Sequence, residues 1–158
     1  MVRKILKPLH RTLLRQEKTL AVAESCTGGL LSSYLTRLPG ASAYFICGVI
    51  TYSNKAKISL LNIPAKTIAQ HGAVSLTVAK LMAKNVRQKN KVDFGLSITG
   101  IAGPGKASTL KSVGTVFIAL ADKNKTLGQS FHFSGSRESI RHQAVKKALN
   151  LLAAQVQL

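Results

Sequence analysis

The sequence feature that most constrains the fold is a short polar loop, residues 23–29, between two apolar segments. The apolar run Thr19 to Ala23 precedes it, and an amphipathic segment from Leu30 to Leu38 follows. An apolar strand that ends in Ser, Thr and two glycines before a helix leaves backbone N–H groups without partners at the helix start. Such a turn favours anions, and Ser25 and Cys26 within it are nucleophiles. The loop predicts the floor of an active site; the alternative is that it only caps the helix.

The rest of the chain repeats this alternation of apolar runs and amphipathic segments. Further strands are predicted at residues 44–52, 92–99, 113–121 and 126–133, the last two as an antiparallel hairpin. Helices are predicted near the N-terminus, after Ser53, Pro64 and Ser75, and after residues 134–136. The pattern indicates one α/β domain over residues 1–158, a three-layer α/β/α sandwich with a mixed, mostly parallel sheet of about five strands.

Composition narrows the class of protein. The chain has 158 residues, of which 23 are Lys or Arg and only five are Asp or Glu, so its formal net charge is +18. This charge favours anionic ligands, and nucleic acid would bind only non-specifically, because no Arg-rich block alternates with aromatic residues. No apolar tract is long enough for a membrane span. Cys26 and Cys47 lack metal or disulfide spacing, which favours a cytoplasmic protein without a metal site.

The N-terminal segment is basic and amphipathic. Pro8, His10 and scattered charges interrupt its apolar residues, so we do not expect a secretory signal. A helix that packs on the core is the preferred interpretation, and a transit peptide is the alternative.

Three polar segments follow predicted strands: the loop at Ser25, the turn from Tyr52 to Lys57, and the glycine loop that starts at Thr99. Ligands of open α/β sheets bind beyond the carboxyl ends of the parallel strands. We therefore expect these segments to converge on one site, and their convergence carries more weight than any single motif.

Five segments, in order and spacing, resemble the CinA C-terminal domain family, which contains the nicotinamide-nucleotide amidases. They are residues 23–29, 48–57, 72–75, 99–105 and 113–116. The resemblance implies hydrolysis of the amide of nicotinamide mononucleotide to nicotinate mononucleotide and ammonia. It also implies that the domain needs no metal or other cofactor and assembles into homo-oligomers.

Catalytic roles follow from the resemblance together with the chemistry of amide hydrolysis. Ser25 is the expected nucleophile, and Lys57, which matches the family's lysine, is the expected base once desolvation and cations such as Lys55 lower its pKa. Tyr52 is placed beside Lys57 as an orienting hydroxyl, although a buried tyrosine at a strand end explains it equally well. Cys26 is the rival nucleophile, with a small buried hydrophobe as the preferred interpretation.

Binding roles are expected for two loops and one helix. Backbone N–H groups around Thr27, Gly28 and Gly29 are expected to bind the oxyanion or the phosphate. From the glycine loop and the last helix, the expected substrate-binding residues are Thr99, Gly100, Gly103 and Arg141, the last with Arg137 as a second phosphate ligand. His71 is expected to satisfy carbonyl groups at a helix end rather than to catalyse.

Three departures from the family pattern bear on activity. Lys55 and Ser136 stand where acids are usual, and residues 106–112 lack the usual prolines and a glutamate at Leu110. The altered loop keeps open a catalytically silent nucleotide-binding domain, and the net charge of +18 keeps open a basic protein that associates with nucleic acid.

Overall fold

The computed structural model describes residues 2–105 and 111–157, with the backbone alone for residues 2 and 3. The described residues form a five-stranded sheet in the order β2-β1-β3-β4-β5. Its strands are β1 Leu20–Glu24, β2 Phe45–Ile50, β3 Phe94–Gly100, β4 Thr115–Ala121 and β5 Thr126–His132. Strand β1 pairs in parallel with β2 and β3, while β4 pairs antiparallel with β3 and β5. The prediction of a mixed sheet of about five strands is confirmed.

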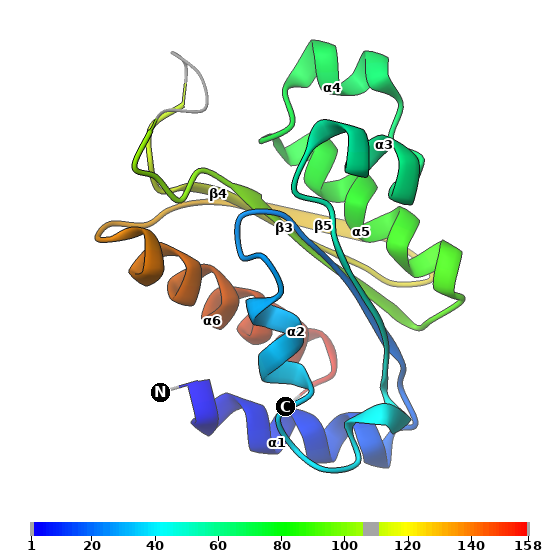
Figure 1. Ribbon diagram of the computed structural model, residues 1–158. Coiled ribbons are helices and arrows are strands. Elements are labelled where there is room, and N and C mark those ends of the chain that lie inside the picture. The colour runs from blue at the N-terminus through cyan, green and yellow to red at the C-terminus, as the bar shows by residue number, and fades with distance from the viewer. Residues whose placement is uncertain (1, 106–110, 158) are drawn as a thin grey trace.

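Helices cover both faces of this sheet (Figure 1). One layer contains α1 Val2–Arg15, α2 Leu30–Leu35 and α6 Arg137–Gln155, and the other contains α3 Asn54–Leu61, α4 Ala65–His71 and α5 Leu76–Asn90. A 3-10 helix, η1 Ala41–Ala43, leads into β2. The larger apolar core lies under α1, α2 and α6, and a second one lies under α3, α4 and α5. The three-layer α/β/α sandwich is therefore also confirmed.

Local sequence signals explain where the helices begin. The side chains of Ser53, Ser75 and Ser136 each accept a hydrogen bond from a backbone N–H three residues ahead, so they cap α3, α5 and α6. Pro64 caps α4 without a side-chain bond. These caps fix the position of the first helical turn, and with it the direction in which the first side chains of α3 and α6 point.

Parallel pairing brings three strand ends to one edge of the sheet. Glu24 at the end of β1 lies in register with Ile50 of β2 and Ile98 of β3. The chain leaves the sheet there, and the N–H groups of Ser25 and Thr51 donate to the carbonyls of Ile98 and Glu24. The three polar segments that follow these strands therefore start side by side, as the sequence predicts.

No helix in the described part of the chain combines the length and apolar character that a membrane span requires. Residues 106–110, which include the departure from the family pattern at Leu110, lie outside the described residues.

Candidate active site

A serine and a buried lysine meet at the carboxyl edge of the sheet. The Lys57 Nζ donates to Ser25 Oγ over 3.1 Å and to the Thr51 carbonyl over 2.7 Å. Ser25 is 8% exposed and Lys57 is 1% exposed, so the pair is shielded from bulk water. The two residues are 32 positions apart in the sequence, and the β1–β2 pairing together with α3 brings them into contact.

Lys57 points inward because of its position on α3. The Ser53 side chain accepts from the Ala56 N–H and starts the helix, so Lys57 lies in the first turn. Residues four apart share a helix face, and Lys57 shares its inward face with the buried Leu61. A lysine therefore occupies a position that would otherwise hold an apolar core residue.

Burial shapes the charge of this site. Desolvation lowers the pKa of Lys57 from 10.5 to about 8, and the Cys26 sulfur opposes the shift. We expected cationic neighbours such as Lys55 to contribute, but Lys55 is exposed and burial is the main cause. Burial also raises the pKa of the Cys26 thiol to about 11. Near neutral pH, Lys57 therefore has a populated neutral form, and Cys26 is an unreactive thiol.

Glu24 lies beneath the site and has a structural role that the sequence does not predict. Its side chain is fully buried, and its carboxylate accepts from the N–H groups of Gly29, Leu31 and Ser32 and from the Ser32 hydroxyl. The carboxylate thus occupies the start of α2 that we expected to bind a substrate anion. The detectable signal was an acid at the end of an apolar strand, in a chain with only five acids.

The donors of the nucleophile loop differ from those expected. Besides the Gly29 N–H, which donates to Glu24, the Gly28 N–H donates to the Ser25 carbonyl. The N–H groups of Cys26 and Thr27 donate to no other residue within residues 2–105 and 111–157. Of the three expected backbone donors, only the N–H of Thr27 therefore lacks a partner residue, and Thr27 is buried outside the cavity lining; the Cys26 N–H, directly after Ser25, belongs to a residue that lines the cavity.

Ser25 opens into a cavity of about 330 Å³. Its walls come from the turn that carries Tyr52, Asn54 and Lys57, from the α4–α5 connection at residues 73–74, and from the glycine loop. Gly100 and Gly103 line it as expected. A side chain at Gly100 would meet the β4 backbone at 2.8 Å, so glycine keeps this wall close to the sheet.

Arg137, not Arg141, reaches this cavity. The Arg137 guanidinium donates to the Tyr52 hydroxyl over 2.9 Å and to the Gly103 carbonyl. Arg141, one turn further along α6, instead donates to the Thr27 carbonyl over 2.7 Å and is not part of the lining. Arg141 on α6 therefore holds the loop at residues 25–29, whereas the Arg137 guanidinium lies at the cavity mouth.

Two expected contacts are not formed. Tyr52 is 58% exposed, so it is not a buried strand-end tyrosine, and its hydroxyl bonds to Arg137 rather than to Lys57. Thr99 is buried, and its hydroxyl donates to the Ala73 carbonyl, which ties the α4–α5 connection to β3. His71 is exposed at the end of α4 and does not line the cavity.

Two buried polar atoms beside the loop, Thr27 Oγ1 and Arg141 Nε, have no hydrogen-bond partner among the described residues. Buried polar atoms usually bind protein groups or ordered water. Thr27 is fully buried and outside the cavity lining, so its side chain does not face the site.

Comparison with known proteins agrees with this fold. The profile of the CinA C-terminal domain matches residues 2–156. A CinA-like protein from Geotalea daltonii is 50% identical over 134 residues, which are 85% of this chain and 32% of that protein. A putative competence-damage inducible protein from Caldicellulosiruptor bescii is 44% identical over 155 residues, 98% of this chain and 38% of that protein. The chain thus spans about a third of the length of the curated relatives it matches.

Solved structures are similar over the whole domain. A CinA superfamily protein from Klebsiella pneumoniae has a TM-score of 0.95 at 30% identity, with 99% of this chain and 98% of that chain covered. A competence/damage inducible protein from Agrobacterium tumefaciens has a TM-score of 0.95 at 34% identity, with 99% and 96% covered. With a profile match across residues 2–156 and the same fold throughout, the chain belongs to the CinA C-terminal domain family.

Proposed function

We propose that this domain is an amidohydrolase that converts nicotinamide mononucleotide into nicotinate mononucleotide and ammonia. The observation that carries the proposal is the Ser25–Lys57 pair: a nucleophile 3.1 Å from an amine whose pKa is lowered to about 8 by burial. The substrate comes from the family resemblance, and the residue chemistry supports the reaction class, since amide hydrolysis requires a nucleophile, a base and oxyanion donors.

The geometry suits a neutral lysine as base. A neutral amine has two hydrogens and one lone pair, so Lys57 can donate to the Thr51 carbonyl and accept the Ser25 hydroxyl proton. In the first step, Ser25 Oγ bonds to the amide carbon while its proton passes to Lys57 Nζ. The carbonyl oxygen takes the negative charge and lies toward the N–H group of Cys26, which lines the cavity.

Collapse of this intermediate breaks the C–N bond. The Lys57 ammonium returns its proton to the departing nitrogen, which leaves as ammonia, and the acyl group stays as an ester on Ser25. Water then attacks the ester and gives a proton to Lys57. When the ester bond breaks, Ser25 Oγ recovers that proton and nicotinate mononucleotide leaves.

Arg137 is the residue that we assign to the substrate phosphate. It lies at the cavity mouth with Tyr52 and Gly103, and a guanidinium binds phosphate through two parallel hydrogen bonds. Arg141 was the expected phosphate ligand, but its guanidinium donates a hydrogen bond to the Thr27 carbonyl. The Tyr52 hydroxyl, which we expected to orient Lys57, would then orient the Arg137 guanidinium.

Ammonia release from nicotinamide mononucleotide by the purified chain tests the proposal, with the pyridine product identified by chromatography. Ser25→Ala is the matched control, because it removes the nucleophile and leaves the cavity in place. If the parent chain releases no ammonia but nicotinamide mononucleotide raises its melting temperature, the domain is a silent nucleotide binder, and the amidase proposal fails.

A further inference from the structure

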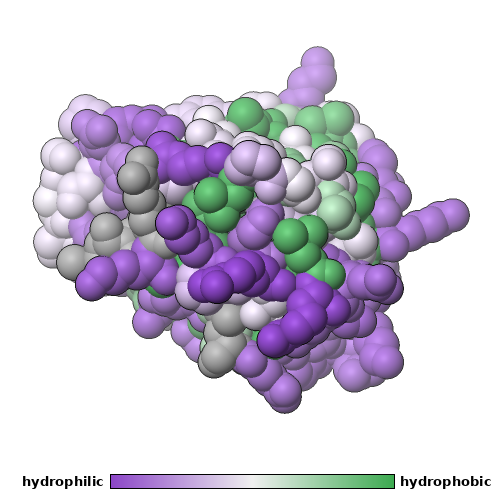
Figure 2. All heavy atoms as spheres, turned by 90° about the horizontal axis from the view of Figure 1, so that it is seen from below, coloured by the Kyte–Doolittle hydropathy of each residue, from purple (hydrophilic) through white to green (hydrophobic). Residues whose placement is uncertain are grey.

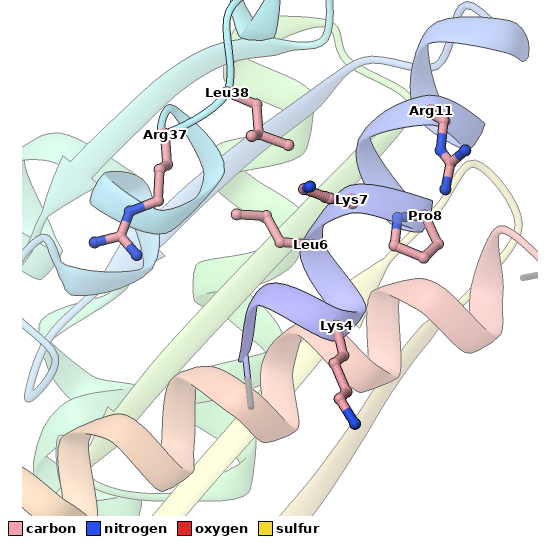
Figure 3. Close-up of a pocket in the computed structure, with 7 residues that line it drawn as sticks. All are labelled: Lys4, Leu6, Lys7, Pro8, Arg11, Arg37 and Leu38. Atoms are coloured by element: carbon pink, nitrogen blue, oxygen red, sulfur yellow. The ribbon is translucent and has the colours of Figure 1, made fainter.

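A second and larger hollow lies on the α1 side of the molecule, formed by α1 and the residues that follow α2. Its volume is about 640 Å³, and it shares no lining residue with the cavity at Ser25. Pro8 and Leu38 are half-buried and give this hollow its apolar lining, together with the edge of Leu6, which is 2% exposed (Figure 3). The surrounding face is mostly hydrophilic with separate apolar patches (Figure 2).

Four cations form the rim of this hollow. Lys4, Lys7 and Arg11 come from α1, and Arg37 follows α2. Lys4, Lys7 and Arg11 recur at helical spacing, so they lie along one side of α1. None of the described lining residues is acidic.

Three of these four cations have no partner in the described ranges. The side chains of Lys4, Lys7 and Arg11 form no ion pair or hydrogen bond with any residue in the described ranges, and Arg37 lies over the Tyr34 ring. No acid in the described ranges forms an ion pair with them: Asp93 pairs with Lys18, Glu138 lies near His142, and Glu24 is buried at the start of α2. Pro8 lacks an N–H, so the Lys4 carbonyl also loses its helical donor.

We propose that this hollow binds an organic polyphosphate, a small molecule in which two or more phosphates are joined to an apolar body. The volume falls within the range of about 300–1,000 Å³ typical of small-molecule sites. The apolar body covers Pro8 and Leu38, and the phosphates reach the rim, where four cations from two segments exceed what one phosphate can contact.

The lining fits an organic polyphosphate better than it fits a second copy of the chain or a nucleic acid. A second copy docked on this particular face would need acids opposite the four cations, and the chain has only five acids. A nucleic-acid duplex would touch the basic rim but would leave the apolar floor uncovered. Single strands bind through stacking on aromatic side chains, and no aromatic residue is part of the described lining.

Isothermal titration calorimetry with adenosine triphosphate tests the proposal. Two further probes are tripolyphosphate, which has the phosphates without the apolar body, and adenosine, which has the body without the phosphates. The rim variant is Lys7→Glu with Arg11→Glu. The charge-matched control is Lys66→Glu with Lys123→Glu, two exposed lysines outside this hollow. Circular dichroism melting checks that both variants fold.

We expect adenosine triphosphate to bind more tightly than either half-probe. The rim variant should lose about tenfold or more in affinity, because attraction becomes repulsion, while the control should lose about twofold or less. Leu38→Ser should weaken adenosine triphosphate but not tripolyphosphate.

Equal losses in the rim variant and the control would show that net charge alone attracts the ligand and would overturn the proposal. Equal affinities for adenosine triphosphate and tripolyphosphate would do the same, as would full displacement by duplex DNA. Arg137→Ala should leave binding unchanged, since Arg137 lines the other cavity. The proposal does not depend on amidase activity, so a failure of either one can be distinguished.

Discussion

Replacement of Lys57 by Met should change how the stability of the fold depends on pH. Methionine has about the same length and fills the buried position on α3 without an ionisable group. The pKa of Lys57 is about 8 in the fold, against 10.5 ordinarily, because burial disfavours the ammonium. Between these two values the unfolded chain binds more protons than the folded chain. The free energy of unfolding of the parent must therefore rise with pH in this window.

The magnitude follows from the shift in pKa. At about 1.36 kcal/mol per pKa unit, holding the charged lysine in the fold at pH 7 costs about 3 kcal/mol. Deprotonation removes most of this cost by pH 10, so the free energy of unfolding of the parent should rise relative to Lys57→Met by about 2.5 kcal/mol from pH 7 to pH 10. Below pH 7, Lys57 is charged in both states and the difference should stay constant.

The assay is urea unfolding of parent and variant at a series of pH values, followed by circular dichroism. Groups that titrate alike in both chains cancel in the difference between them. The hydrogen bond from Lys57 to Thr51, which the variant lacks, adds an offset and not the expected rise with pH. Lys66→Met is the matched control, because Lys66 is exposed on α4 and its removal should leave the difference flat. A difference between parent and Lys57→Met that is equally flat from pH 7 to pH 10 would refute the reasoning.

The remaining predictions concern activity toward nicotinamide mononucleotide. Turnover by the parent should rise through one ionisation near pH 8, and be about tenfold higher on the alkaline plateau than at pH 7, where about a tenth of the lysine is neutral; a profile that is flat from pH 6 to pH 9 would contradict a lysine base. Ser25→Ala should lose about a thousandfold or more in kcat, while Cys26→Ala should cost little because its thiol has a pKa of about 11, and steady-state ammonia release compares them. Glu24→Gln should lower kcat more than it changes KM, because an amide side chain cannot accept all four hydrogen bonds that the carboxylate accepts at the start of α2. An unchanged kcat would show that this carboxylate does not position the loop that carries Ser25. Arg137→Ala should raise KM with a smaller effect on kcat, whereas Arg141→Ala should lower the melting temperature, because only the first faces the cavity; the reverse pattern would return the phosphate to Arg141.

Local signals in the sequence were sufficient for the fold. Apolar runs separated by serine and glycine turns predict the five strands and the six α-helices that the structure describes, and Ser53 and Ser75 cap their helices as expected. Ser136, predicted only to precede the last helix, is its cap. The tight connection at residues 122–125 gave the antiparallel hairpin. The sheet edge that gathers Ser25, Thr51 and the glycine loop follows from parallel pairing alone, so the location of the site was predictable too.

Contacts between distant segments were not predictable in the same way. Arg137 and Arg141 lie one turn apart on α6, and the sequence does not tell which of them faces the cavity. That choice depends on how α6 packs across the sheet. The role of Glu24 is of the same kind. The sequence predicts a helix start that is open to a ligand, whereas in the structure the Glu24 carboxylate accepts hydrogen bonds from the N–H groups there.

The burial of Lys57 is the feature that stability alone does not explain. Its side chain is 1% exposed, and its two hydrogen-bond partners, the Ser25 hydroxyl and the Thr51 carbonyl, are neutral. Buried lysines are normally paired with a carboxylate, because an uncompensated charge destabilises the fold. A methionine or leucine at this position of α3 would pack beside Leu61 without that loss of about 3 kcal/mol. The proposed function explains this loss of stability. Burial destabilises the ammonium, so Lys57 gives up its proton near pH 8, and the neutral amine can then accept the proton of Ser25.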